Sequence, residues 1–393
     1  MHSQYRDYLA SFGFALFVCS HTMSLIFSTT GVFVYTLIAS VLLIIYATNF
    51  STLRRLLKRQ LLVYFYILFL FLLSAFQCKF SGGNEEALYE YFSLFCLTGT
   101  GALIISNNEY DFDKVMRCFI VLSFLLAPVL LTSSYSTKTY EVSNDEWMAY
   151  SYRILPFLVA AVYYLYSGTS KCFRLLSILL LVLFFSVFIS HTARGPFVAL
   201  VGSVLFLLIQ KQIKKGIRLK VILGELFVFL FFVIIGLDLI LEVLGNLTNR
   251  YELRFMSKFL FADDISNQRT PIYINAFNGF VESPLWGNGI SSFVWRYNAW
   301  PHNIFLQMMY ETGILMLIPF SYILFQSVKM MISKYNTIFD NRLISFLFII
   351  SITELMFSQY FWKKHYFWLL IWATLYNINW IKQIKFKTLH RNR

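Results

Sequence analysis

The sequence predicts an all-α fold: a polytopic membrane bundle of about twelve transmembrane helices. Hydrophobic residues make up 58% of the chain and charged residues only 13%, whereas soluble domains carry about 25% charged residues. Apolar runs of about 20 residues recur along the chain, and this length crosses a bilayer as a helix. Basic residues collect between alternate runs, as they do in the cytoplasmic loops of membrane proteins.

The apolar runs can be placed in order, with a large polar interruption before the last three. They are expected at residues 9–27, 30–48, 60–77, 88–106, 115–133, 148–167, 174–191, 196–210, 221–245, 303–328, 343–361 and 365–381. The first run leads into the second without a small-residue cleavage site, so we expect no cleavable signal peptide.

The distribution of lysine and arginine predicts the orientation of the helices. Basic clusters follow the second, sixth, eighth and tenth runs and fill the tail. Their members include Arg54, Arg55, Lys58, Arg59, Lys171, Arg174, Lys211, Lys214, Lys215, Arg218, Lys220, Lys329, Lys334, Lys382 and Lys385. Each of these clusters follows an even-numbered run, which predicts that all the clusters and both termini are cytoplasmic. The net charge of +13 is assigned to these clusters, and we expect no nucleic-acid partner.

Three parts follow from this order. Residues 1–245 hold the first nine helices, residues 246–301 form a long loop, and residues 302–393 hold three helices and a basic tail. The charge of the loop is nearly balanced, and its neighbours predict that it lies on the non-cytoplasmic side.

A short helix is expected inside this loop, over residues 271–282. Pro271 suits the first turn of a helix, and Ser283–Pro284 ends it. Gly287 and Gly289 then permit turns. The expected apolar stripe of the helix consists of Ile272, Ala276, Phe277 and Phe280.

The sequence predicts no metal site and no cofactor. The five cysteines are scattered and include no CxxC pair, so neither a disulfide framework nor a metal cluster is expected. Asp263 and Asp264 are neighbouring acids in a loop, and such pairs are usually only solvated.

His302 lies where the long loop meets the tenth run. An imidazole titrates near neutral pH and suits a general base, although a histidine at such a place is often only an interfacial polar residue. Asn303 can cap the helix that follows. Glu311 is an ionisable residue inside an apolar run, which indicates function unless it packs against another polar group.

Two arginines are candidates for binding phosphate. Arg194 lies between the seventh and eighth runs, where Gly195–Pro196 predicts a fixed break, and Arg269 begins the expected loop helix. A guanidinium binds phosphate through two parallel hydrogen bonds, although an arginine at a helix end can also simply extend to the membrane surface. Two arginines and one histidine on the outer face predict a site for a diphosphate.

These residues resemble the O-antigen ligase/polymerase superfamily. The signature runs from Arg269 through Pro-Leu-Trp-Gly-Asn-Gly to His302–Asn303 and, nine residues later, Gly313. Thr-Ala-Arg-Gly-Pro-Phe-Val-Ala-Leu around Arg194 resembles the earlier arginine motif, with Val198 where ligases often have leucine. The stretch between Gly289 and the histidine is shorter than usual for the family.

The resemblance implies a metal-independent, GT-C-like glycosyltransferase of the bacterial inner membrane, with the loop and the active site in the periplasm. The implied donor is a glycan on undecaprenyl diphosphate. Arg194 and Arg269 correspond to the diphosphate-binding arginines and His302 to the essential histidine. Gly287, Gly289, Asn303 and Glu311 are expected to help bind substrate, and a chain-length regulator is a further possible partner.

The resemblance leaves polymerase and ligase open. A polymerase passes the glycan to a second lipid-linked repeat unit, and a ligase passes it to the lipid A–core. The segment Trp147–Pro156 is similar to a stretch common in polymerases, which favours polymerase and makes Arg153 a secondary candidate for binding glycan or phosphate. A transporter is the competing class; it would need charged residues along a path through many helices, and the acids inside the runs are few: Glu225, Asp238 and Glu354.

Overall fold

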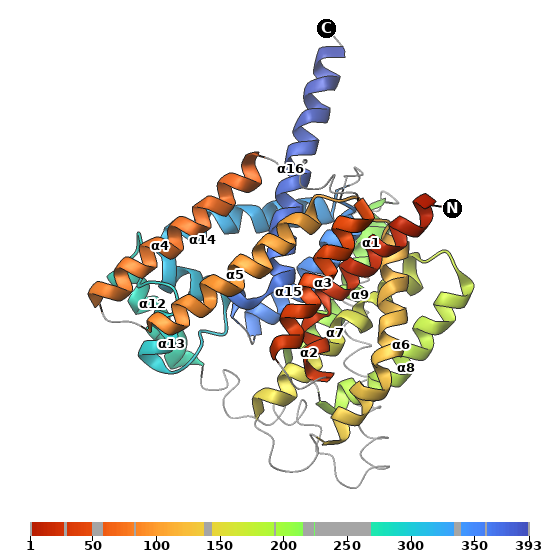
Figure 1. Ribbon diagram of the computed structural model, residues 1–393, viewed down its shortest axis with the longest axis horizontal. Helices are drawn as coiled ribbons and strands as arrows, with labels where there is room; N and C mark the ends of the chain where they lie inside the picture. The colour runs from red at the N-terminus through yellow and green to blue at the C-terminus, as the bar shows by residue number, and fades with distance from the viewer. Residues whose placement is uncertain are drawn as a thin grey trace. The chain divides into compact units, whose positions relative to one another are not determined.

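The computed structural model describes residues 2–26, 30–48, 58–81, 84–136, 144–191, 194–214, 224, 269–333, 339–357 and 360–391. Within these ranges every regular element is a helix (Figure 1). The helices are α1 His2–Val18, α2 Ser20–Ile26, α3 Thr30–Thr48, α4 Lys58–Ser81, α5 Glu85–Ser106, α6 Phe112–Ser136, α7 Asn144–Ser167, α8 Lys171–His191, α9 Arg194–Lys214, α12 Thr270–Glu282, α13 Ser292–Tyr297, α14 Ile304–Met331, α15 Asn341–Phe357, the 3₁₀ turn η2 Phe361–Lys363 and α16 His365–Arg391.

The predicted apolar runs coincide with helices wherever the chain is described. The first run is divided at Cys19 into α1 and α2. Apart from Gly224, the run predicted at 221–245 lies outside the described residues, and so do Asp263, Asp264, Glu225 and Asp238.

Five of the described helices are long and apolar enough to cross a membrane. The segments are Gly31–Thr48, Lys58–Lys79, Glu85–Ser106, Phe112–Leu131 and Ile304–Met331. The chain is therefore a multi-pass membrane protein, and the number of about twelve crossings stays a prediction.

The chain divides into two compact units. Unit 1 comprises residues 1–122 and 268–393, and unit 2 comprises residues 123–267. The predicted three-part division stays a prediction, since much of its loop lies outside the described residues. In unit 2, α7 packs against α8 and α9, and its residues 154–161 are buried.

The core of unit 1 surrounds the first half of α16, which packs against α5, α14 and α15. Trp368 and Trp372 on α16 and Trp362 on η2 are fully buried. Because a buried indole N–H needs an acceptor, Trp372 donates to the Gly99 carbonyl (3.0 Å) on α5. The buried Gln60 side chain of α4 donates to the Trp372 carbonyl (3.1 Å) and holds α4 on the same core.

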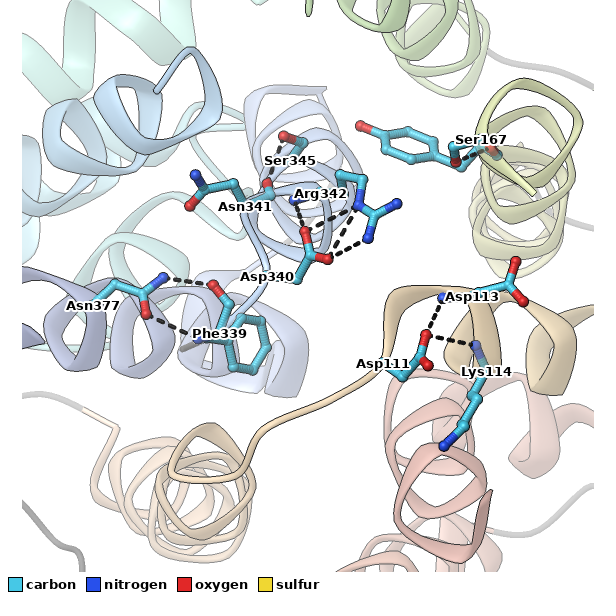
Figure 2. A network of polar contacts seen from close by, with 11 residues as sticks. Asp111, Asp113, Lys114, Ser167, Phe339, Asp340, Asn341, Arg342, Ser345 and Asn377 are labelled. Atoms are coloured by element: carbon cyan, nitrogen blue, oxygen red, sulfur yellow. Dashed lines mark hydrogen bonds and ion pairs between the residues drawn. The ribbon is translucent and has the colours of Figure 1, made fainter. Parts of the chain in front are cut away.

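Polar contacts group the helix ends of unit 1 into two sets. We call residues 74–81, 84–91, 269–314 and 360–364 the loop end, and its contacts are described below. The opposite end joins the starts of α6 and α15 to the middle of α16 (Figure 2). There Asp340 pairs with Arg342 (2.6 Å), and Asn377 bonds both backbone groups of Phe339. The order in which the helices cross the membrane stays a prediction.

Candidate functional site

Helix α14 is broken at Gly313. This residue has φ +61° and ψ −151°, far from helical values, and separates a short first part of α14 from a longer second part. Such a conformation is essentially restricted to glycine. The break releases backbone groups that an unbroken helix would pair internally, and these groups need partners because they are buried.

A glycine-containing turn supplies those partners. The N–H groups of Asn288 and Gly289 donate to the carbonyls of Tyr310 (2.7 Å) and Glu311 (2.9 Å), and the Pro284 carbonyl accepts from the Ile314 N–H (2.9 Å). We call these two facing segments, residues 284–289 and 310–314, the glycine clasp. The Pro-Leu-Trp-Gly-Asn-Gly motif and Gly313 are thus two halves of one backbone pairing.

Two glycines of the clasp have no space for a side chain. A Cβ on Gly287 would lie 2.3 Å from the Thr312 nitrogen, and a Cβ on Gly313 would lie 2.5 Å from the Pro284 oxygen. Both residues also have positive φ, as does Gly289 (φ +97°). The prediction that Gly287 and Gly289 permit turns is confirmed; their contact with substrate stays a prediction.

The clasp is attached to α4 by two side chains. Gln77 donates to the Gly287 carbonyl (3.0 Å), and the Ser74 hydroxyl accepts from the Ile290 N–H (3.1 Å). These contacts fix a turn of the long loop against a predicted membrane helix more than 200 residues earlier in the chain.

Glu311 is the buried centre of the loop end. Its carboxylate has no exposed surface and accepts four hydrogen bonds. The donors are the Tyr360 hydroxyl (2.6 Å), the Trp362 indole (2.8 Å), the Ser291 N–H (3.2 Å) and the Gln307 amide (3.3 Å). A buried carboxylate is stable only when it is well hydrogen-bonded. This geometry indicates that Glu311 positions the clasp, and a direct contact of Glu311 with substrate stays a prediction.

Tyr360 and Trp362 were not identified from the sequence. Both follow α15: Tyr360 lies at the apolar end of the eleventh run, and Trp362 comes directly after that run. Buried Tyr and Trp side chains need hydrogen-bond acceptors, and this need was the only sequence signal for a contact with Glu311. No spacing in the sequence links either residue to Glu311.

The loop helix α12 and the first part of α14 run in the same direction. Successive residues of α12 contact successive residues of α14. Ile272 of α12 and Leu306 of α14 both pack on the cluster of Ala276, Phe293 and Tyr310. Further on, Pro284 pairs with Ile314. The starts of the two helices therefore lie at the same end.

Arg269 is the N-cap residue of α12, and His302 precedes Asn303, the N-cap of α14. A helix N-terminus carries partial positive charge, and the guanidinium adds a full charge, so the start of α12 favours a nearby anion. The approach of Arg269 to His302 and their binding of a phosphate stay predictions. Arg269 is half-buried, at the N-cap of α12, as predicted.

His302 lies in a constrained turn. Its φ of +49° is in the left-handed region, which is uncommon and strained for a non-glycine residue. Pro301 before it is buried, and Asn303 after it caps α14 by accepting from the N–H groups of Phe305 (3.0 Å) and Leu306 (3.2 Å). The predicted Asn303 cap is confirmed. The His302 side chain is half-buried.

Helix α13 supports the same site. Phe293 packs edge-on against Tyr310 (4.8 Å between ring centroids), and Arg296 forms an ion pair with Glu282 at the end of α12 (3.7 Å). Hydrogen bonding to Tyr310 raises the pKa of the Arg296 guanidinium. In the described ranges no three His, Cys, Asp or Glu side chains gather so that they could hold a metal ion.

Residues 178–321 match the family model of O-antigen ligase. The resemblance to the O-antigen ligase/polymerase superfamily is thereby confirmed for this segment, which contains Arg194, Arg269, His302 and the whole glycine clasp. No curated protein matches the chain significantly. The match indicates ligase or polymerase chemistry on lipid-linked glycans.

The other two predicted arginines lie in unit 2. Arg194 is the first residue of α9, and Arg153 is half-buried on α7, which packs against α9. Arg194 lies inside the O-antigen ligase segment and Arg153 outside it. Arg153 and Arg194 lie in a different unit from His302, and the approach of either arginine to His302 stays a prediction.

Two expectations outside the clasp are corrected or refined. Of the predicted apolar stripe of α12, Ala276 is buried and Phe277 is 52% exposed, because Ala276 and the neighbouring Gly279 face α14. The small side of α12 lets Tyr310 approach closely. Glu354, noted as an acid inside an apolar run, forms a buried ion pair with Lys364 (2.7 Å).

Proposed function

We propose that this protein is a membrane glycosyltransferase that transfers a glycan from undecaprenyl diphosphate to an acceptor sugar hydroxyl. The observation that supports the proposal is the glycine clasp, which joins the segment after α12 to α14, the two helices whose starts carry Arg269 and His302. The family match to residues 178–321 supports the substrate class. We place this end at the periplasmic face of the bacterial inner membrane, with both termini in the cytoplasm.

In this reaction the acceptor hydroxyl oxygen bonds to the anomeric carbon of the donor glycan, and the bond from that carbon to the diphosphate oxygen breaks. The hydroxyl proton passes to the His302 imidazole, which acts as general base. The electron pair of the broken bond leaves with undecaprenyl diphosphate. Arg194 and Arg269 balance the charge on this leaving group, so the chemistry requires no metal.

We favour a polymerase, in which the acceptor is a second lipid-linked repeat unit. The support is the Trp147–Pro156 segment and the Arg-Gly-Pro sequence at Arg194. In this scheme Arg153 contacts glycan or phosphate, and a chain-length regulator is a partner. The second candidate is a ligase that transfers the glycan to lipid A–core, and the description of the matched family as O-antigen ligase favours it.

Lipopolysaccharide from a deletion strain separates the two candidates. Loss of a polymerase leaves the core with a single repeat unit, whereas loss of a ligase leaves the core without any.

The site is tested in the same strain by complementation with Arg194→Ala, Arg269→Ala and His302→Ala. Removing a general base costs about 10²–10⁴-fold in rate, so we expect the long-chain ladder to disappear. Arg342→Ala is the control, since Arg342 lies at the opposite end of unit 1 in a partly exposed pair with Asp340. Normal ladders from all three well-expressed site variants would contradict the assignment.

A further inference from the structure

Three tryptophans of the long loop have exposed side chains. Trp286 is 51% exposed, Trp295 is 52% exposed and Trp300 is 41% exposed. Exposed indoles in a membrane protein can lie at the membrane surface or bind a ligand, because the ring is apolar and the N–H is polar. Their surroundings distinguish the three residues.

Trp300 is the one in ring contact with the candidate base. Its ring centroid lies 6.4 Å from that of His302, and the two rings are nearly perpendicular (84°). A second ring contact is with Tyr360, at 6.3 Å and 72°. Two aromatic partners therefore cover part of the indole, and 41% of the side chain stays exposed.

The support behind Trp300 is rigid. Tyr360 is buried, stacks on Tyr91 of α5 (4.9 Å, 26°) and donates its hydroxyl to Glu311 (2.6 Å). The contacts form a continuous series from the glycine clasp through Tyr360 and Trp300 to His302. A binding residue held by such a series is preorganised for its ligand.

We propose that Trp300 binds the acceptor sugar by stacking against the apolar C–H face of its pyranose ring. This inference rests on the proposed function, because it assigns the acceptor side of the same site. A pyranose has an apolar face and hydroxyls around its rim, so a sugar that lies on the indole can direct a rim hydroxyl to the neighbouring His302. That hydroxyl must come within hydrogen-bond reach of the base for the proton to move.

The test uses full-length protein in membranes from the deletion strain. The probe is lipid-free oligosaccharide, released by mild acid from the lipid-linked repeat units of that strain. It lacks a diphosphate and cannot serve as donor, so it competes only on the acceptor side. The inhibition constant of this probe and the maximal rate of transfer are measured for Trp300→Ala, Trp300→Phe and the matched control Trp295→Ala.

We expect Trp300→Ala to raise the inhibition constant about tenfold, in line with the loss of an aromatic contact. Trp300→Phe should give a smaller rise, since a ring remains, and Trp295→Ala should give none. Equal effects of the Trp300 and Trp295 variants would overturn the proposal in favour of membrane anchoring. A lower maximal rate with an unchanged inhibition constant would also overturn the proposal. If Trp300→Ala does not accumulate in the membrane, the same result with Trp300→Phe would overturn it.

His302→Ala is measured in parallel to separate the two levels of inference. Full transfer by His302→Ala overturns the proposed function itself. If His302→Ala is inactive and the Trp300 variants bind the probe normally, only the acceptor contact fails.

Discussion

The two ends of unit 1 are both held by polar contacts, but the contacts differ in kind. At the opposite end, Asp340 and Asp111 accept from the first backbone N–H groups of their helices, and the Asp340–Arg342 pair is partly exposed (Figure 2). These are ordinary helix caps with regular backbone. At the loop end, a fully buried carboxylate holds a broken helix, and several residues have positive φ.

This difference places the backbone strain of unit 1 at the loop end. Residues in unusual backbone conformations persist only where the surrounding structure determines them, and they concentrate at functional sites. Gly313 and His302 are such residues, eleven positions apart in one helix and its leading turn. Variants at the loop end should therefore affect activity and folding together, whereas variants at the opposite end should affect neither strongly.

The largest effect is expected for Gly313→Ala. The new Cβ would meet the Pro284 oxygen at 2.5 Å, and alanine does not adopt this backbone conformation. We expect a loss of about 3 kcal/mol or more in stability, measured as a lower thermal transition in detergent, together with loss of the glycan ladder. Gly202→Ala on α9 is the control, since a Cβ there meets nothing within 4 Å. Equal losses of stability and of the glycan ladder in the two variants would contradict a special role for the glycine clasp.

Glu311→Gln is expected to come next. The amide keeps the shape but replaces an accepting oxygen with an N–H₂ group that faces donors, so at least one of four hydrogen bonds is lost. Leaving buried polar groups unpaired costs about 1–3 kcal/mol. Thermal denaturation and the glycan ladder measure the outcome. A variant with full stability and activity would show that the carboxylate does not position the clasp.

Tyr360→Phe should have a smaller effect that sharpens the comparison. It keeps the ring contacts to Tyr91 and Trp300 and removes only the hydroxyl donated to Glu311. We expect a loss of about 1–2 kcal/mol in stability and a lower maximal rate. Tyr322→Phe is the control, because Tyr322 is exposed on α14 away from the clasp. Equal losses in the two variants would contradict a specific role for Tyr360.

The smallest effect is expected at the opposite end, for Arg342→Ala. Arg342 pairs with Asp340 and lies over the Phe112 ring (4.2 Å), with a side chain that is 36% exposed. A partly exposed pair of this kind contributes about 1 kcal/mol or less. We expect a normal glycan ladder and a thermal transition close to that of the wild type. Loss of the glycan ladder in Arg342→Ala would contradict the predicted difference between the two ends of unit 1.

Local signals in the sequence predicted several parts of the site. Pro271 and Ser283–Pro284 marked the ends of α12, because proline fits a first turn and stops a helix. Asn303 was predicted as a helix cap and is one. Each of these features depends on neighbours within a few residues, so the sequence contains the information in one place.

The remaining features depend on distant partners. Gly313 matched a family motif, but nothing in its neighbourhood predicts that the next residue, Ile314, donates to the Pro284 carbonyl. Tyr360 and Trp362 lie about 50 residues beyond Glu311 and read as ordinary apolar residues. Phe277 belongs to the apolar stripe of α12 but is 52% exposed, because the small residues Ala276 and Gly279 are the ones that pack against Tyr310 of α14.

The break in α14 also has a consequence for depth in the bilayer. The helix from Ile304 to Met331 has 28 residues, about 42 Å at 1.5 Å per residue. The hydrocarbon layer is only about 30 Å thick, and the part after Gly313 alone extends about 27 Å. The part after the break alone therefore covers most of the hydrocarbon layer. We predict that the first nine residues, with His302 before them, lie near the level of the lipid headgroups.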